Sequence, residues 1–381
     1  MKINVLLIEN SGSDFYKSRS KFAIYLKENG YNVIVLIPHD GYFQKITDLG
    51  LIVFEYHLTR NKKLFSNIYQ IHLVLKNLFK KHEVNIVHSF RFLPNFINVT
   101  LNLFSKRNVI IHVTGLGIAY SSENIKYKIY KKISNFVYFF LIIFSKKVIV
   151  QNHEDLNDLL FLSNMKKKFV LVKGSGVDTD YFNSIHVDIS KIKVDLNIES
   201  DEIIFTCVTR LIWEKGIKEL VNAFIKINKI HSKTRLLVIG DFDASNPRSV
   251  SEEFVNYANR ISRINFMGNR NDVRNILAIT NGFIYPSYYR EGIPRSILEA
   301  LSMGIPIITT NMPGCKLTVI PNSNGFLIPP KSEDSIINAI EQFILLPNQF
   351  ESMKMSSRLL ALNEFSNHII YEQILQVYID L

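Results

Sequence analysis

Short apolar runs alternate with longer amphipathic stretches along the whole chain. In the first half the apolar runs cover residues 5–8, 33–37, 86–88, 109–113, 148–150 and 169–172, and in the second half 203–208, 236–239, 264–267, 282–285, 305–309 and 325–328. Such short runs without polar alternation are typical of strands buried on both faces of a parallel sheet. The stretches between them, such as 18–29, 218–230 and 295–303, carry apolar residues at helical spacing. The pattern predicts an α/β fold with two doubly wound, Rossmann-like domains.

Two glycines mark the predicted boundary between these domains. Gly174 and Gly176 follow the last strand of the first half, and glycines this close together favour a turn or hinge. We therefore expect a first domain over residues 1–178 and a second over 199–364, with the polar stretch 184–201 as a linker. A chain of 381 residues suits two domains of this size. Residues 365–381 predict a helix with one apolar stripe, which either caps the second domain or packs back on the first.

The net charge of +11 is distributed unevenly along the chain. Residues 1–180 contain 25 Lys and Arg against 13 Asp and Glu, a balance of +12, whereas the remainder contains 20 against 21, a balance of −1. A basic first half indicates an anionic partner, which is a nucleic acid, an anionic lipid or a phosphorylated ligand. The alternative is a solvated, lysine-rich surface that has no such partner.

The apolar runs and the cysteine count bear on where the chain works. The longest apolar run, 136–144, has nine residues, whereas a membrane span needs about 20. No secretory signal precedes the first predicted strand. Cys207 and Cys315 are too few for a disulfide scaffold and favour a reducing compartment. We therefore expect a cytoplasmic protein that does not cross the membrane.

The most informative motif is Pro-Ser-Tyr-Tyr-Arg-Glu-Gly-Ile-Pro-Arg-Ser-Ile-Leu-Glu, which ends at Glu299 and follows a predicted strand. Pro294 suits the first turn of a helix, where its missing N–H costs nothing. Gly292 lets the backbone approach a ligand closely, and the free amides at the helix start attract an anion. Glu291 and Glu299 are candidates to accept hydrogen bonds from hydroxyls of two different sugars. The alternative is an ordinary strand–helix unit with surface glutamates.

A second motif, Thr-Arg-Leu-Ile-Trp-Glu-Lys-Gly, directly follows the predicted strand 203–208. Ligands of doubly wound sheets bind at the carboxyl ends of the strands. Arg210 and Lys215 are therefore placed to face a diphosphate at the start of the helix that follows Gly216. Two fixed cations would neutralise the charge that builds on a leaving nucleotide, so we expect neither a metal nor a cofactor. The alternative is solvated charge in a loop.

The first domain has a glycine loop, His-Val-Thr-Gly-Leu-Gly, that begins at the end of the predicted strand 109–113. Its backbone amides are expected at the edge of the cleft, facing the second domain. His112 lies inside the apolar run, where a packed histidine is a more common interpretation than a catalytic base. The loop 9–14 has a single glycine, whereas a dinucleotide fingerprint requires three at fixed spacing, so we do not expect it to bind NAD in the usual way.

Residues 125–147 mix six lysines with aromatic and aliphatic side chains. Helices at a membrane interface have this composition, and each surface cation contributes about 1 kcal/mol on anionic lipid. The alternative is a core helix between two strands. Both interpretations hold together if one face is buried and the lysines point outward.

Together these residues resemble glycosyltransferase family 4, whose members have the GT-B fold, two Rossmann-like domains facing a central cleft, and retain the configuration of the transferred sugar. The resemblance spans nearly the whole chain and is strongest over 263–330, where Phe-Met-Gly, the Glu-x7-Glu motif, Pro-Gly-Cys and Asn-Gly-Phe-Leu-Ile-Pro occur in order. It implies that Glu291 contacts the donor sugar and Glu299 the ribose. It also implies that Arg210 and Lys215 contact the diphosphate. The implied donor-binding residues further include Gly292, Ile293, Pro294 and Arg295.

Three motifs, Tyr-Tyr-Arg-Glu-Gly, Val-Thr-Gly-Leu-Gly and Pro-Gly-Cys, are similar to the branch that builds bacterial surface glycans such as capsule or O-antigen. This resemblance implies transfer of a hexose or N-acetylhexosamine from a nucleotide sugar, most commonly a UDP-sugar, to a saccharide on undecaprenyl diphosphate. It also implies a peripheral enzyme at the anionic inner face of the cytoplasmic membrane. The acceptor side would include His112, Thr114 and Gly115. Many relatives carry His-Gly where Thr114-Gly115 stands, so the leaving phosphate, not a protein base, is expected to take the acceptor proton.

Three other classes remain as alternatives. A nucleotide-sugar epimerase shares the two-domain architecture, but it needs no lipid acceptor. A nucleic-acid-binding protein would explain the basic half, yet no nucleic-acid module is visible, so we expect no such partner. An inactive scaffold in a membrane assembly is the third alternative, and it requires that the two glutamates do nothing.

Overall fold

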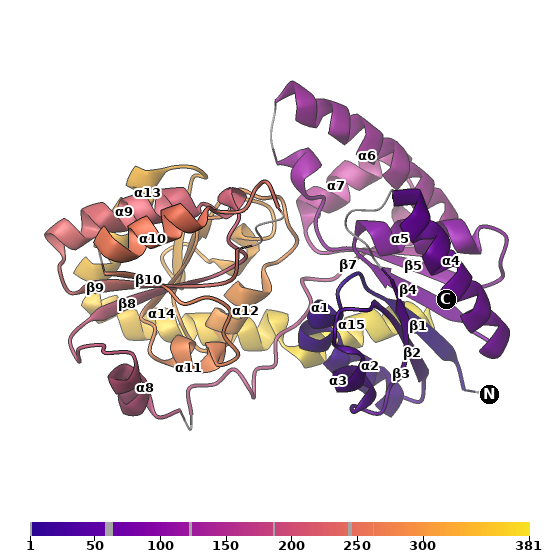
Figure 1. Ribbon diagram of the computed structural model, residues 1–381, viewed down its shortest axis with the longest axis horizontal. Helices are drawn as coiled ribbons and strands as arrows, with labels where there is room; N and C mark the ends of the chain where they lie inside the picture. Colours follow the sequence, from indigo (N-terminus) through magenta and orange to yellow (C-terminus); the bar gives the residue numbers. More distant parts are fainter. Residues whose placement is uncertain (1, 58–63, 122–123, 186, 243–245, 262) are drawn as a thin grey trace. The chain divides into compact units, whose positions relative to one another are not determined.

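The computed structural model describes residues 2–57, 64–121, 124–185, 187–242, 246–261 and 263–381 (Figure 1). The chain divides into two compact units. The first consists of Met1–Gly176 with Asn367–Leu381, and the second of Val177–Ser366. Each unit is built around a parallel sheet with helices on both faces. The doubly wound α/β architecture predicted from the apolar runs is therefore confirmed.

Within the described residues, the first unit has a seven-stranded sheet in the order β3-β2-β1-β4-β5-β6-β7. The strands are β1 (Asn4–Ile8), β2 (Asn32–Pro38), β3 (Ile52–Tyr56), β4 (Ile86–Phe90), β5 (Asn108–Val113), β6 (Lys147–Val150) and β7 (Phe169–Leu171). Successive side chains of a strand point to opposite faces. In β1, Val5 and Leu7 pack into the core on one face, whereas Leu6 and Ile8 pack on the other. Burial on both faces explains the unbroken apolar run.

Helices from both ends of the chain cover one face of this sheet. They are α1 (Gly12–Ser18), α2 (Ser20–Glu28), α3 (Phe43–Thr47) and α15 (Asn367–Ile379). The other face is covered by α4 (Leu64–Lys81), α5 (Phe92–Asn102), α6 (Ile125–Phe144) and α7 (His153–Ser163). Helix α15 lies beside α2 (Figure 1). It buries Ile370 and Ile374 in the core cluster that contains Phe22.

Strand β3 is absent from the predicted runs for a physical reason. It lies at the edge of the sheet, where Ile52 is 48% exposed and Glu55 is tolerated. An edge strand is partly solvated, so its sequence does not need to be continuously apolar.

Within the described residues, the second unit has a six-stranded sheet in the order β10-β9-β8-β11-β12-β13. Its strands are β8 (Ile203–Val208), β9 (Thr234–Ile239), β10 (Ile264–Phe266), β11 (Gly282–Tyr285), β12 (Ile307–Thr310) and β13 (Gly325–Ile328). Each of them overlaps a predicted apolar run. One face is covered by α9 (Ile217–Ile230), α10 (Glu252–Ile261) and α13 (Glu333–Leu345), and the other by α11 (Val273–Ala278) and α12 (Arg295–Ser302). Helix α14 (Pro347–Leu360) and a π-helical turn (Ala361–Phe365) follow.

The stretch 184–201, expected to be a linker, contains helix α8 (Ile189–Asp195). Ile192, Leu196 and Ile198 pack in a core cluster with Ile276 and Ile279. The linker expectation was wrong, because this segment belongs to the second unit and packs on it through a few apolar residues within a mostly polar sequence.

The chain passes between the units twice, at residues 176–177 and 366–367. The amide of Val177 donates to the Phe365 carbonyl at 2.9 Å, so these segments run side by side. Gly176 has φ +80°, and a Cβ there would lie 2.7 Å from Oδ1 of Asn367. The conformation and the close approach both require glycine at this crossing.

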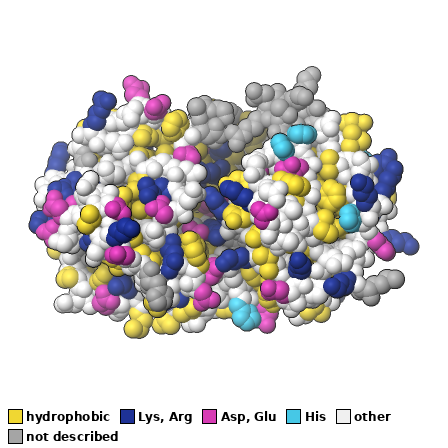
Figure 2. All heavy atoms as spheres, turned by 60° about the horizontal axis from the view of Figure 1, so that its bottom comes forward, with side chains coloured by type: hydrophobic (Ala, Val, Ile, Leu, Met, Phe, Trp, Pro, Cys, Tyr) yellow, Lys and Arg dark blue, Asp and Glu magenta, His cyan; other side chains and the backbone are white. Residues whose placement is uncertain are grey.

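The excess positive charge belongs to the first unit. Its residues contain 25 Lys and Arg against 13 Asp and Glu, whereas those of the second unit contain 20 against 21. Basic and acidic side chains are interspersed over the second unit in Figure 2. Among the described residues, no helix combines the length and apolar character needed to cross a membrane.

Candidate functional site

The two central strands of the second unit bring together two of the predicted site residues. Strands β8 and β11 are neighbours, and the strand order reverses between them. Open α/β sheets bind ligands outside the carboxyl ends of the strands at such a point. Lys215 ends the short 3₁₀ turn Trp213–Lys215 that follows β8. Glu291 lies in the loop between β11 and α12.

Lys215 is a nearly buried cation, with a side chain that is 3% exposed. Its Nζ donates to Oε1 and Oε2 of Glu291, each at 2.7 Å, and to the Tyr285 hydroxyl, also at 2.7 Å. The ammonium lies 5.0 Å from the ring centroid of Tyr285 and 5.5 Å from that of Tyr289. Aromatic faces attract a cation at this range. The carboxylate and the rings together compensate for the lost hydration of the charge.

Glu291 is held by three side chains and remains partly accessible. Its Oε1 accepts from Ser287 Oγ at 3.0 Å, and the Tyr285 hydroxyl lies 3.1 Å from the same oxygen. The carboxylate side chain is 19% exposed. The roles of Tyr285 and Ser287 were missed in the sequence, although both lie at the strand end that begins the Glu-x7-Glu segment. Only the fold shows that they face the carboxylate.

Two glycines allow the loops of this site to pack backbone to backbone. Gly216 has φ +73°, and a Cβ there would overlap the carbonyl oxygen of Pro286. Gly314 has φ +82°, and a Cβ there would overlap the carbonyl oxygen of Gly292. Any larger residue would separate the loops after β8, β11 and β12.

Two helices begin beside the Lys215–Glu291 pair. Helix α9 starts after Gly216, and α12 starts after Pro294. Neither start has a side-chain cap among the described residues. Their first-turn amides and positive dipole ends therefore lie at the same end of the sheet as Lys215, an arrangement that attracts anions. The predicted donor-binding residues Gly292, Ile293 and Pro294 are buried in the loop that leads into α12.

The remaining predicted donor residues belong to the same unit, on α12 and directly after β8. Arg295 and Glu299 form an ion pair one turn apart on α12, with 2.8 Å between Nε and Oε1. Arg210 follows β8 and has an exposed side chain. In the described part of the chain, no hydrogen bond joins Arg210 or Glu299 to Lys215 or Glu291.

Burial controls the protonation of three further groups near this pair. It raises the pKa of Tyr285 well above 10, and the Glu291 charge adds to the effect. Burial also raises the pKa values of Cys207 and Cys315 to about 12. The tyrosine hydroxyl therefore keeps its proton, and the two free thiols stay neutral and unreactive.

The predicted acceptor-side residues lie at the end of β5 in the first unit. His112 is fully buried, and its Nε2 lies 3.2 Å from Nε2 of Gln151. Burial, followed by the nearby charge of Arg19, lowers the pKa of His112 well below 6.5. This is the environment of a packed, neutral histidine. Thr114 and Gly115 follow in the loop and are half-buried.

The first sheet has its own polar group where its strand order reverses, between β1 and β4. Glu9 follows β1 and is buried, and burial raises its pKa although Arg91 opposes the shift. Arg91 follows β4 with φ +74°, and its Nη2 lies 2.6 Å from Oδ2 of Asp14. The sequence pattern did not reveal this group. The available signal was an arginine three residues after the apolar run 86–88.

A comparison with known proteins identifies the family of the second unit. Residues 188–359 match the family of glycosyl transferases group 1. This match lies inside the second unit and includes Lys215, Glu291 and Glu299. The second unit is a group 1 glycosyltransferase domain. The resemblance found in the sequence is therefore confirmed at this level, and the chain is a glycosyltransferase.

Two curated glycosyltransferases are similar over most of the chain. One is the N,N'-diacetylbacillosaminyl-diphospho-undecaprenol alpha-1,3-N-acetylgalactosaminyltransferase of Campylobacter jejuni, 25% identical over 97% of both chains. The other is the UDP-Gal:alpha-D-GlcNAc-diphosphoundecaprenol alpha-1,3-galactosyltransferase of Escherichia coli. It is 28% identical over 85% of this chain and 82% of its own.

Solved structures share the fold of this glycosyltransferase. A glycosyltransferase from Rickettsia africae has a TM-score of 0.81 at 21% identity, covering 100% of this chain and 98% of its own. HepE from Anabaena, solved with UDP-glucose, has a TM-score of 0.84 at 18% identity and full coverage of both chains. These likenesses agree with the predicted GT-B fold.

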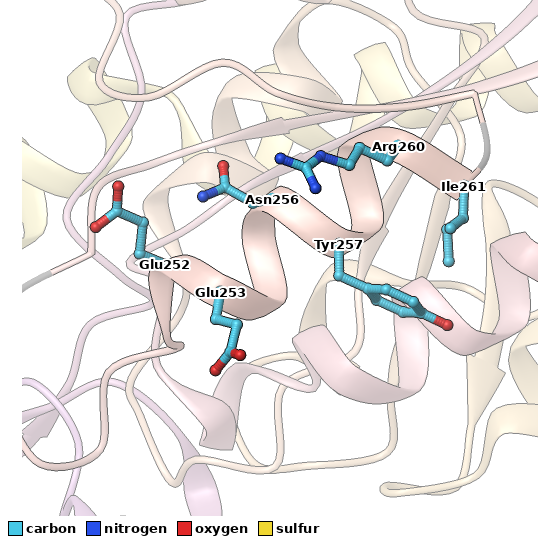
Figure 3. Close-up of a pocket in the computed structure, with 6 residues that line it drawn as sticks. All are labelled: Glu252, Glu253, Asn256, Tyr257, Arg260 and Ile261. Atoms are coloured by element: carbon cyan, nitrogen blue, oxygen red, sulfur yellow. The ribbon is translucent and has the colours of Figure 1, made fainter.

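A pocket elsewhere in the glycosyltransferase domain offers no comparable chemistry. All the residues that line it belong to helix α10 (Figure 3): Glu252, Glu253, Asn256, Tyr257, Arg260 and Ile261. Side chains from a single helix do not converge on a ligand as side chains at the carboxyl ends of neighbouring strands do. Among the described residues, no group of three or more His, Cys, Asp or Glu is placed to hold a metal ion.

Proposed function

We propose that this glycosyltransferase transfers a hexose or N-acetylhexosamine from a UDP-sugar to a saccharide on undecaprenyl diphosphate, with retention of configuration, in bacterial surface glycan assembly. The main observation in support of nucleotide-sugar binding is the Lys215–Glu291 pair, at the point where the strand order of the second sheet reverses. The pair lies between two helix starts that attract a diphosphate. In this proposal Glu291 contacts the donor sugar, Glu299 contacts the ribose, and Lys215 and Arg210 contact the diphosphate.

The donor and the acceptor class rest on the relatives. The Escherichia coli enzyme is named for a UDP-galactose donor, and HepE was solved with UDP-glucose. The names of both curated relatives specify a diphospho-undecaprenol acceptor. The net charge of the first unit, +12, is of the sign that attracts a lipid diphosphate.

The chemistry follows from fixed positive charge at the leaving group. Departure of the nucleotide places negative charge on the diphosphate, where Lys215, Arg210 and the helix amides stabilise it without a bound metal. His112 is buried and neutral, so it is a poor candidate for the acceptor base. We therefore assign the acceptor proton to the departing phosphate, which is on the same face as the incoming hydroxyl in a retaining reaction.

The site proposal is tested by Glu291→Ala and Lys215→Ala. Each is expected to lower turnover on the order of 100-fold or more, because each removes a contact to the transition state. The assay mixes UDP-sugars with an undecaprenyl-diphosphate-linked saccharide, and NMR of the product must show the anomeric configuration of the donor.

The matched controls are Glu253→Ala and Lys218→Ala, which remove the same charges at exposed positions of the same unit. Full activity of both site variants would refute the assignment. Release of a free epimerised sugar nucleotide without any acceptor would instead favour an epimerase.

We further propose that helix α6 rests on the anionic inner face of the cytoplasmic membrane. Its buried side carries Tyr138, Leu141 and Ile142 and packs on the sheet. Its opposite side exposes a row of large apolar residues at helical spacing: Ile125, Ile129, Ile133 and Phe136.

Basic residues border this apolar row. Lys128 and Lys132 are exposed, and Nζ of Lys131 lies 5.0 Å from the ring centroid of Tyr120. The side chain of Lys126 lies outside the described residues. An apolar row bordered by cations complements an anionic lipid surface better than it does water.

Replacing Lys128, Lys131 and Lys132 by Ala tests this surface. The two exposed cations, Lys128 and Lys132, at about 1 kcal/mol each, with a smaller contribution from the half-buried Lys131, predict roughly 30-fold weaker binding to vesicles that contain phosphatidylglycerol, with unchanged affinity for UDP. Replacing the exposed Lys191, Lys218 and Lys229 of the second unit removes the same charge as a control. Equal vesicle binding by the two triple variants would contradict a specific role of α6.

A further inference from the structure

The hydrogen bonds of Lys215 leave its ammonium with no free donor. An ammonium group has three N–H bonds. They are taken by Oε1 and Oε2 of Glu291 and by the hydroxyl of Tyr285, all at 2.7 Å. With the side chain 3% exposed, solvent cannot substitute for these partners. In this state Lys215 binds a phosphate oxygen only if it gives up one of them.

Both carboxylate oxygens of Glu291 are also already hydrogen-bonded. Its Oε1 receives hydrogen bonds from Lys215 and from Ser287, and Tyr285 lies within hydrogen-bond distance of both carboxylate oxygens. A sugar hydroxyl therefore competes with Lys215 for this carboxylate. The two groups that the donor needs are each other's main partners in the unliganded site.

Tyr285 and Ser287 stay with the carboxylate when the lysine leaves. Burial keeps the Tyr285 hydroxyl protonated, so it continues to donate to Glu291. The Ser287 hydroxyl donates from the same loop at 3.0 Å. The backbone at this strand end is fixed in turn, because Thr309 Oγ1 donates to the Tyr285 carbonyl at 2.7 Å.

We propose that Glu291 is a built-in competitor for Lys215, which the diphosphate of the donor displaces. Tyr285 is then a positioning residue: with Ser287 it holds the released carboxylate where a hydroxyl of the donor sugar can bind. This inference rests on the proposed function of the site. It explains how the site favours a nucleotide sugar over a free nucleotide: UDP breaks the ion pair without offering Glu291 a new partner, whereas a UDP-sugar offers its hydroxyls.

Calorimetric affinity for UDP alone tests the competition. Glu291→Gln removes the competing charge but keeps the shape, so it is expected to bind UDP about 10-fold more tightly than the native chain while losing transfer activity. Lys215→Met is expected to weaken UDP binding. Adding Glu291→Gln to Lys215→Met should then give no gain, since no lysine remains to be released.

Tyr285→Phe provides the second variant, because it keeps the ion pair and the packing of the ring. It also frees one N–H of Lys215, so it is expected to lower kcat about 10-fold without raising the donor KM, as loss of an interaction needed only for positioning does. An unchanged kcat, or equal losses in kcat and donor affinity, would remove the positioning role.

The outcomes separate the two proposals. If Glu291→Gln binds UDP no more tightly than the native chain does, the competition is refuted while the donor site stands. If the native chain does not bind UDP at all, both the donor site and the competition are refuted.

Discussion

Single residues decide the geometry of the donor site. Lys215 and Glu291 come from sequence positions 76 residues apart, yet they form one bonded pair because β8 and β11 are adjacent. A lysine with 3% exposure has a desolvation cost that its carboxylate partner and the flanking aromatic rings offset. The sequence motifs placed both residues at strand ends, but they could not show that the two side chains bond to each other.

At Gly216 both the backbone conformation and the close packing require glycine. Gly216→Ala places a Cβ against the Pro286 carbonyl oxygen at φ +73°. We expect a loss of about 2–4 kcal/mol in unfolding free energy, of which about 1–2 kcal/mol is the left-handed conformation itself. Gly268→Ala is the matched control, because Gly268 has φ +64° and its nearest neighbour lies 3.9 Å away. Equal losses in urea unfolding of the two variants would contradict the packing argument.

Two buried histidines make the first unit sensitive to acid. Burial lowers the pKa values of His88 and His112 well below 6.5, and their rings stack at 5.6 Å. Below pH 6.5 the unfolded chain binds protons that the folded chain does not, so stability is lost as the pH falls from 6.5 toward the folded pKa values. Two such protons predict a slope of up to about 2.7 kcal/mol per pH unit. The pKa of Glu9 is raised, so the folded chain binds one proton at this carboxyl more readily than the unfolded chain does. This partly offsets the loss of stability as the pH falls.

Urea unfolding at pH 7, 6 and 5, with hydrogen exchange of β4 and β5 as the local probe, measures this slope. His112→Phe is expected to reduce it by about half, since one titrating group is removed. His57→Gln is the control, because His57 is exposed. A slope that does not respond to His112→Phe would contradict the assignment.

At the scale of elements, the last helix belongs to the core of the first unit. Ile370 of α15 is fully buried in the cluster that contains Phe22, whereas Ile379 of the same helix is 64% exposed. Ile370→Ala is expected to cost about 2–5 kcal/mol of unfolding free energy, and Ile379→Ala within about 0.5 kcal/mol. Denaturant unfolding of both variants checks this. Similar values for the two would show that α15 does not pack as described.

The elements also show what a sequence can and cannot predict. Strands such as β1, β8 and β11 were predictable because burial on both faces demands an unbroken apolar run. Strand β3 and helix α8 were not, because β3 is a partly exposed edge strand and α8 has no buried residue. The Glu-x7-Glu motif identified the site segment. The roles of Tyr285 and Ser287 in the site could not be predicted, because they depend on the pairing of β11 with its neighbouring strands, which no local sequence pattern encodes.

At the scale of the whole molecule, the two units divide the chemistry. The second unit carries the group 1 glycosyltransferase match and nearly balanced charge, whereas the first unit carries the entire basic excess. In our proposal this separates binding of the nucleotide sugar from binding of the lipid diphosphate and of the membrane.

A crystal structure of the chain with UDP would show directly whether the diphosphate displaces Glu291 from Lys215. We predict the diphosphate at the carboxyl ends of β8 and β11, within hydrogen-bond distance of Nζ of Lys215 and of first-turn amides of α12, with Glu291 detached from the lysine and still bonded to Tyr285. UDP bound elsewhere at saturating concentration, or a site left empty with the Lys215–Glu291 pair intact, would contradict the account.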